Sequence, residues 1–157
     1  MNLNHLTLKT QEAVQAAQQY AFEKGHPQIE NEHLFYGLLE VDDTVLPFIF
    51  NKLQVQLPLL KQMNESALKR FSKVEGGAQV LSQKASQTLM NAIALAKKQQ
   101  DEYVATEHLL QALFESNGTL SKMLSDQGIT KKKLQDTLNE LRKGEKVTSA
   151  SAEENYN

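Results

Sequence analysis

The sequence Ile29-Glu-Asn-Glu-His-Leu34 returns 75 positions later as Val104-Ala-Thr-Glu-His-Leu109. Sliding residues 6–44 onto residues 81–119 gives ten identities in 39 positions, including the Glu, His and Leu of this motif. A self-match at one fixed offset is the signature of a duplicated structural unit. The sequence therefore predicts two copies of one unit, related by an internal pseudo-twofold axis.

Each copy places apolar residues at the spacing of amphipathic helices, with glycine and proline between the helical stretches. We expect an all-α fold in which two pseudo-twofold-related four-helix units form one compact eight-helix domain. The expected helices span about 7–24, 31–43, 44–52 and 56–71 in the first unit, and about 83–100, 106–116, 119–126 and 130–142 in the second. Polar residues at helix starts predict the N-caps Thr7, Asn31, Ser82, Thr106 and Thr130.

The domain boundaries follow from the repeat and from local composition. A chain of 157 residues is long enough to bury a substantial core. A glycine pair marks the joint between the units, and the last residues have almost nothing to bury, which predicts a flexible segment. The expected ranges are a domain over 1–143, with repeat one at about 4–71, a joint at 72–81 and repeat two at about 82–143, followed by a flexible linker over 144–157.

Composition and charge exclude several classes of partner. A net charge of −2 and a pI near 6.1 indicate no basic surface for nucleic acid. The sequence has no cysteine, so it offers neither disulfides nor thiolate ligands and nucleophiles. The start lacks the features of a signal peptide, and no apolar stretch approaches the ~20 residues of a membrane span. We expect a cytoplasmic protein that binds neither nucleic acid nor membrane.

The repeated Glu-His-Leu motif has a structural and a chemical interpretation. At a helix start, Glu32 and Glu107 lie favourably against the positive end of the helix dipole, while Leu34 and Leu109 begin a buried stripe. A zinc site would need a second histidine one turn later, as in His-Glu-x-x-His, and neither copy has it. A carboxylate pair of Glu32 and Glu107 would require the two groups to approach each other across the pseudo-twofold axis. The residues favour the structural interpretation and predict no metal site.

Motifs of nucleotide and hydrolase chemistry are absent from the sequence. There is no Gly-x-x-x-x-Gly-Lys-Ser/Thr phosphate loop, and the pair Gly76-Gly77 lacks the lysine and helix start that such a loop requires. There is no Gly-x-Ser-x-Gly nucleophile elbow either. The basic run at 131–133, at a helix start, is typical of a solvated face. We expect a non-catalytic binding domain that uses no cofactor of its own.

The paired units resemble the Clp repeats at the N-terminus of Clp-family AAA+ chaperones. Within that family the chain is most similar to the ClpB-type protein disaggregases, and the resemblance covers essentially the whole chain. The stretches that carry it are the helix start at Leu6-Thr7, the Ile-Glu-x-Glu-His-Leu motif, the joint Val74-Glu-Gly-Gly77, the loop Glu115-Ser-Asn-Gly-Thr-Leu120, and the final segments 141–148 and 152–156.

This resemblance implies the N-terminal domain of a hexameric, ATP-driven disaggregase that works with the DnaK chaperone system. It implies that an apolar groove between the repeats holds exposed segments of unfolded or aggregated polypeptides. ATP and magnesium would bind only in ATPase modules outside this chain, toward which 144–157 would lead, and the isolated domain would be a monomer. Carried over by position, the resemblance assigns substrate binding to Thr7, Leu89, Asp101, Glu107 and His108.

Two other interpretations stay open at this point. An N-domain of the protease-associated Clp type would share the repeats but would recruit a folded adaptor. A free-standing enzyme would use Glu32 and Glu107 as paired carboxylates. A pull-down that retrieves an adaptor in place of unfolded protein would favour the first, and a metal assay or a deep polar cleft would favour the second.

Overall fold

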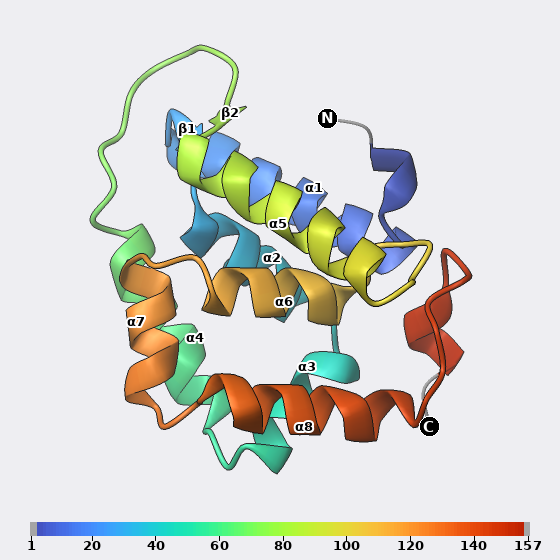
Figure 1. Cartoon of the computed structure of the whole chain (residues 1–157). Helices are drawn as coiled ribbons and strands as arrows, with labels where there is room; N and C mark the ends of the chain where they lie inside the picture. Colours follow the sequence, from blue (N-terminus) through green and yellow to red (C-terminus); the bar gives the residue numbers. More distant parts are fainter. Residues whose placement is uncertain (1–2, 156–157) are drawn as a thin grey trace.

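In the computed structural model, which describes residues 3–155, the chain folds into eight α-helices (Figure 1). The predicted all-α, two-unit architecture is confirmed. The first unit contains α1 (Leu8–Lys24), α2 (Asn31–Val41), α3 (Val45–Lys52) and α4 (Leu57–Leu68), and the second contains α5 (Gln83–Lys98), α6 (Thr106–Phe114), α7 (Thr119–Asp126) and α8 (Lys131–Arg142). Short 3-10 turns, η1 (Leu3–His5) and η2 (Ala152–Asn155), lie near the two ends.

The five helix starts with a predicted N-cap use two different capping devices. Thr7, Ser82 and Thr130 are N-caps as predicted, because each side-chain oxygen accepts a hydrogen bond from the backbone N–H three residues later. The prediction was wrong for Asn31 and Thr106, which are the first helical residues of α2 and α6. At these two starts the histidine of the repeated motif takes over, since its ring nitrogen accepts from the backbone N–H of the N-cap residue.

The short extended segments that precede the helices of one unit pair with those of the other unit. The strands β1 (Gln28–Ile29) and β2 (Val80–Leu81) pair in parallel, with Ile29 opposite Leu81. On the other side of the pseudo-twofold axis, an isolated bridge pairs Leu6 with Val104, the residues at the equivalent positions. The start of α1 therefore lies beside the start of α6, and the start of α5 lies beside the start of α2. Two-residue pairings carry too little alternation to be recognised in the sequence.

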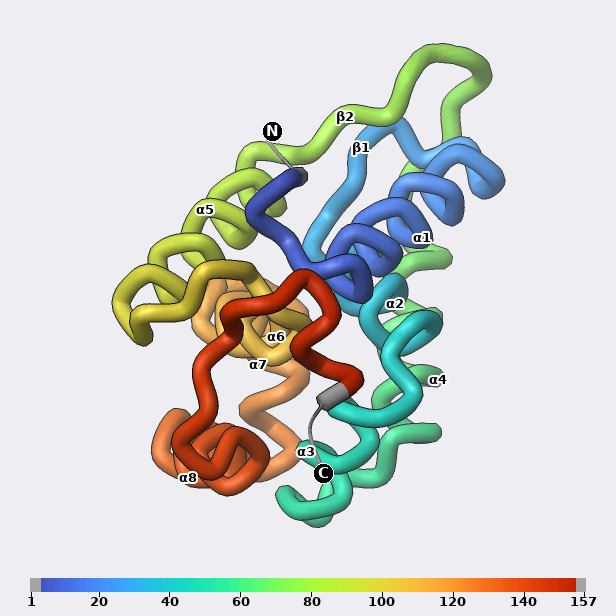
Figure 2. Tube along the Cα trace, turned by 90° about the vertical axis from the view of Figure 1, so that its right-hand side faces the viewer, coloured from blue at the N-terminus to red at the C-terminus, as the bar shows by residue number. Residues whose placement is uncertain are grey.

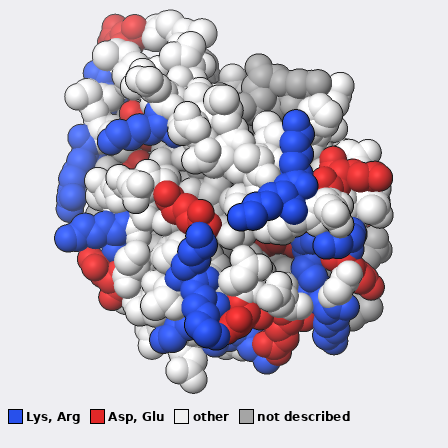
Figure 3. Space-filling model, viewed as in Figure 1, with Lys and Arg blue, Asp and Glu red and all other residues white. Residues whose placement is uncertain are grey.

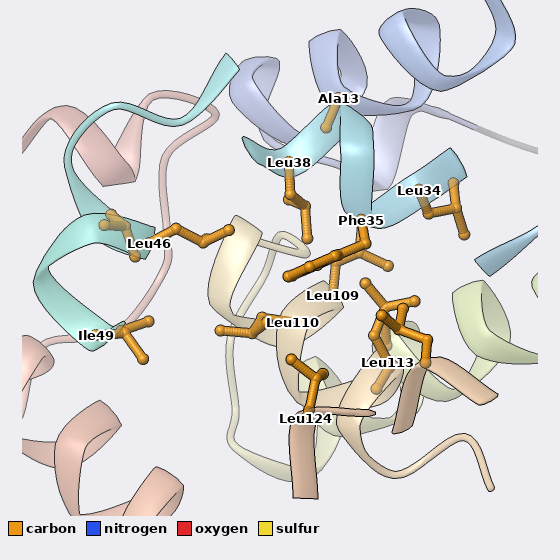
Figure 4. Close-up of a cluster of buried hydrophobic side chains, with 14 of the residues drawn as sticks. Ala13, Leu34, Phe35, Leu38, Leu46, Ile49, Leu109, Leu110, Leu113 and Leu124 are labelled. Carbon is orange, nitrogen blue, oxygen red and sulfur yellow. The ribbon is translucent and has the colours of Figure 1, made fainter. Parts of the chain in front are cut away.

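The core lies where the second helices of the two units meet. Figure 4 shows Phe35 and Leu38 of α2 directed toward Leu109 and Leu110 of α6. None of these four side chains is more than 2% exposed. The apolar residues that follow His33 and His108 therefore form the centre of the hydrophobic core.

A close backbone approach joins α1 to α2. An added Cβ at Gly37 would lie 2.0 Å from the carbonyl oxygen of Ala13. No side chain fits in that space, because packed interiors leave few voids. Gly37 therefore sets the short distance between the first two helices.

The segment after α8, which was expected to be a flexible linker, lies against the domain. Its described residues 144–155 return along the domain and pass over α6 toward the start of α1, as Figure 2 shows in red. Val147 and Ala152 are buried and pack with Ala105 and Tyr103. The described residues contact the domain through backbone hydrogen bonds and one buried carboxylate, which leave no apolar periodicity in the sequence. Residues 156 and 157 of the expected linker lie outside the described residues, and the flexibility of 144–157 stays a prediction. We call residues 145–155 the exit strap.

Candidate functional site

Four of the five residues assigned to substrate binding meet at one place in the structure. Thr7 opens α1 in the first repeat, whereas Asp101, Glu107 and His108 flank the start of α6 in the second. The pairing of Leu6 with Val104 brings these helix starts together, and the Thr7 N–H donates to the carbonyl of Val104 over 3.1 Å. We call this region, formed by the starts of α1 and α6, the α1–α6 seam.

His108 fixes the start of α6 and orients an aspartate. Its Nδ1 accepts from the backbone N–H of Ala105 at 2.8 Å, so the ring proton is on Nε2. Nε2 then donates to Asp101 Oδ2 at 2.8 Å. Both side chains are essentially fully buried. The histidine therefore links the helix start to a buried carboxylate, and its ring does not reach the surface.

Arg142, in the last turn of α8, joins two carboxylates of this network. Its Nε donates to Glu107 Oε2 at 2.6 Å, and its Nη1 donates to Asp101 Oδ1 at 3.0 Å. The arginine side chain is only 11% exposed. Sequence reasoning missed Arg142, because its only local signal is a basic residue at a helix C-terminus, which equally suits the helix dipole.

The surroundings of Asp101 favour its charged form. Burial alone would raise the pKa of this carboxyl group. The hydrogen bonds from His108 and from the backbone N–H of Val147, together with the nearby Arg142 guanidinium, outweigh burial and leave the pKa of Asp101 below its ordinary value. Asp101 is therefore an ionised acceptor for two side chains and one backbone N–H, which come from α6, α8 and the exit strap.

Glu153 of the exit strap completes the α1–α6 seam. Its Oε2 accepts from the Thr7 hydroxyl and, at 3.0 Å, from the backbone N–H of Thr106. The residue is 3% exposed. Burial raises the pKa of Glu153, and the charge of Glu107 acts in the same direction. The sequence pattern did not predict Glu153, because it stands in a polar stretch without periodicity.

Leu89, the fifth assigned residue, lies elsewhere. It is 1% exposed and belongs to the main hydrophobic core. Its neighbour Met90 on α5 is 58% exposed, and Leu8, the neighbour of Thr7, is 55% exposed. Direct apolar contact beside the assigned positions is therefore available from Leu8 and Met90, whereas Thr7 and Leu89 are covered.

The first repeat has a different arrangement at the equivalent place. His33 Nδ1 accepts from the backbone N–H of Glu30, and its Nε2 lies 2.8 Å from Nδ1 of His26. The ring of His33 stacks on Phe71, with centroids 5.4 Å apart. Burial, followed by the neighbouring His26, lowers the pKa of His33 to about 4. This histidine pair is neutral at ordinary pH.

Charged side chains of both signs are mixed on the face that Figure 3 shows. On the face of Figure 3, Lys and Arg side chains alternate with Asp and Glu, without a large patch of one sign. Within residues 3–155 no group of three or more His, Cys, Asp or Glu side chains could hold a metal ion. Glu32 lines a separate hollow with Ser82 and Lys84, whereas Glu107 pairs with Arg142. No helix among the described residues is long and apolar enough to cross a membrane.

Comparison with known proteins identifies relatives of this chain. Residues 5–127 and 80–156 match the family model of the Clp repeat (R) N-terminal domain. The chain is 40% identical over 156 residues to the chaperone protein ClpB of Bacteroides thetaiotaomicron, a match that covers 99% of the chain and 18% of that relative. The chain therefore spans less than a fifth of that relative's length.

Two solved structures show the same fold. The Hsp104 N-terminal domain from Candida albicans superposes with a TM-score of 0.85 at 18% identity, over 96% of this chain and 99% of that one. A ClpV N-domain in complex with a VipB peptide superposes with a TM-score of 0.72 at 16% identity, over 87% of this chain and 86% of that one.

Proposed function

Because the chain belongs to the Clp repeat N-terminal domain family, we propose that it is the substrate-binding N-terminal domain of an ATP-dependent, ClpB-type disaggregase. The observation that carries this proposal is the 40% identity to a ClpB chaperone over 99% of the chain. In this role the domain holds exposed apolar segments of unfolded or aggregated proteins in the cytoplasm. ATPase modules outside the chain, assembled as a hexamer and working with DnaK, supply ATP hydrolysis and pulling.

Two exposed apolar side chains support this role physically. Thr7, Asp101, Glu107 and His108 hold the seam together from within, while Leu8 is exposed next to Thr7 and Met90 is exposed next to Leu89 on α5. Each apolar client group buried against them contributes at most ~1.5–3 kcal/mol before the ordering of the client is subtracted. The expected binding is weak and tolerant of sequence, which suits a domain that must release its client.

Surface substitutions with a matched control test the proposal. Leu8→Asp and Met90→Asp place a charge where client apolar groups would dock, so each should weaken binding of a permanently unfolded model protein by about fivefold or more. Leu59→Asp is the control, because Leu59 on α4 is also an exposed apolar residue, at 42%, but belongs to another part of the molecule. The measurement is fluorescence anisotropy of a labelled client, with thermal melts of all three variants. Equal affinities for the three variants would contradict the proposed surface.

An adaptor-binding domain is the second candidate. It is favoured by the structural similarity to a ClpV N-domain whose structure contains a VipB peptide. A pull-down with the domain that retrieves one folded protein at a fixed ratio, with no enrichment of unfolded polypeptide, would select this candidate over the first.

A further inference from the structure

The exit strap lies on its own domain in the manner of a bound peptide. Leu8 N–H donates to the carbonyl of Ala150 at 2.8 Å, and Glu102 N–H donates to the carbonyl of Val147 at 2.7 Å. Val147 N–H in turn donates to Asp101 Oδ1 at 2.8 Å. Main-chain hydrogen bonds to an extended segment, combined with side chains that fill particular places, are the general features of peptide recognition.

Two side chains of the strap occupy defined positions on the domain, one apolar and one charged. The apolar one is Val147, which is fully buried and packs with Ala105. The charged one is Glu153, whose carboxylate meets the Thr7 hydroxyl and the Thr106 N–H. This position lies at the N-terminal ends of two helices, of 17 and 9 residues. The positive ends of both helix dipoles favour an anion there.

The contact of the strap is incomplete. The second carboxylate oxygen of Glu153, Oε1, is buried and has no hydrogen-bond partner among the described residues. A buried polar atom without a partner costs free energy. The apolar burial of the strap is limited to Val147 and Ala152. Segments with few apolar contacts open at a much lower free energy than the whole fold.

We propose that the surface under the exit strap is a peptide-docking surface, and that an extended segment of a partner protein with a carboxylate at the place of Glu153 docks there when the strap is displaced. The strap, which belongs to the same chain, then competes with the partner segment for this surface. The partner segment inserts a small aliphatic side chain beside Ala105 and an acidic side chain between Thr7 and Thr106. This inference rests on the proposed function in placing partner binding at the α1–α6 seam, and it names an acidic extended segment as the partner.

The first test is a charge-matched pair of variants in the full chain. Glu153→Lys places a cation at the two helix N-termini, whereas Glu154→Lys makes the same change one residue later at an exposed position. Amide hydrogen exchange then reports the strap, because the N–H groups of Leu8, Glu102 and Thr106 donate to it. We expect protection of these three amides to fall by about tenfold or more in Glu153→Lys, equivalent to about 1.4 kcal/mol, and to stay unchanged in Glu154→Lys.

The amide of Ala85, which donates to Ser82 Oγ at the equivalent helix start of α5, shows whether the variant is folded. If Glu153→Lys loses protection there too, Glu153→Ala replaces it in the same measurement. Unchanged protection of the strap-bonded amides in Glu153→Ala, or equal loss in the Glu154→Lys variant, would overturn the proposal.

The second test offers the surface a peptide in trans. A synthetic peptide with the sequence of residues 145–155 is titrated against the isotopically labelled full chain, and a control peptide carries Lys in place of Glu153. We expect only the first peptide to shift the amides of Leu8, Glu102 and Thr106, with at least about tenfold tighter binding to the folded Glu153 variant (Lys or Ala) than to the wild type. Shifts that lie elsewhere, or equal binding of both peptides, would overturn the proposal.

These readouts use no unfolded client. A negative result for strap displacement therefore does not decide the Leu8 and Met90 experiment. A negative result for client binding likewise does not decide the peptide experiment.

Discussion

Residues 26–33 and residues 101–108 occupy equivalent places in the two repeats, yet they bury different chemistry. In both, a histidine three residues after the helix N-cap accepts its backbone N–H. In the first repeat the other ring nitrogen of His33 faces His26, and aromatic rings cover the pair. In the second repeat the histidine donates to Asp101, which also accepts from Arg142.

The difference shows how a duplicated unit acquires a role on one side only. A neutral histidine pair carries no charge that a further ionised group must balance, although His26 Nε2 is buried without a hydrogen-bond partner among the described residues. A buried aspartate requires cationic and N–H partners, and it obtains them from α8 and from the exit strap. The change from His26 to Asp101 at equivalent positions supplies one attachment of the strap, the carboxylate that accepts from the Val147 N–H. Three predictions test this comparison.

The largest expected effect comes from Arg142→Ala. Removing the guanidinium leaves Asp101 and Glu107 buried without their cation, and breaking a buried pair in this way costs about 3–5 kcal/mol. Urea denaturation measures the loss. Arg70→Ala is the matched control, because Arg70 lies on the exposed surface after α4 of the first repeat and its loss should stay within about 0.5 kcal/mol. Similar losses in both variants would mean that the network does not distinguish the repeats.

The second prediction concerns the loss of folding stability at acidic pH. Because the pKa of His33 is lowered to about 4, the unfolded chain binds a proton between pH 6.5 and 4 that the folded chain does not bind. Stability should therefore fall as the pH falls through this window, by roughly 3 kcal/mol. The pKa of Asp101 is also lowered, but from 3.8, so its contribution is present above that value and is lost only at lower pH.

Urea denaturation at a series of pH values separates the two regions. His33→Asn keeps an acceptor for the Glu30 N–H and removes the titrating ring, so the loss of stability between pH 6.5 and 4 should shrink in this variant. An unchanged pH dependence would show that the histidine pair is not the source.

The smallest effect compares the equivalent caps of α1 and α5. Ser82→Ala removes one helix cap, which costs about 1 kcal/mol. Thr7→Ala removes a cap and also a hydrogen bond to the Glu153 carboxylate, so it should cost about 1–2 kcal/mol more. Thermal melts of the two variants, measured side by side, give the difference. Equal melting temperatures would indicate that the Glu153 bond contributes nothing to stability.

The sequence predicted the helices well because the spacing of the apolar residues that they bury is a local pattern. All eight appear, and most bounds agree to within one or two residues. The caps of α2 and α6 could not be predicted in the same way, because the acceptor is a histidine ring nitrogen three residues after the N-cap and the N-cap residues Glu30 and Ala105 lack the usual cap side chains.

The remaining features depend on contacts that leave no local pattern. Arg142 reads as an ordinary basic residue at the end of a helix, and only the fold brings it to Asp101. The exit strap lacks the apolar periodicity that predicts order, and it is held instead by Val147, Glu153 and backbone hydrogen bonds. Leu89 stands beside exposed Met90 on α5, and the sequence alone does not decide which of the two faces the core.

The measurement that tests the proposed function most directly is a titration of the isotopically labelled domain with a permanently unfolded model protein, followed by the amide shifts of every residue. The proposed function predicts weak, saturable binding, with shifts centred on Leu8, Thr106 and Met90 and small shifts along α4 around Leu59. The absence of saturable binding, or shifts centred on α4 and α7, would contradict the proposal that this domain holds unfolded polypeptides through Leu8 and Met90.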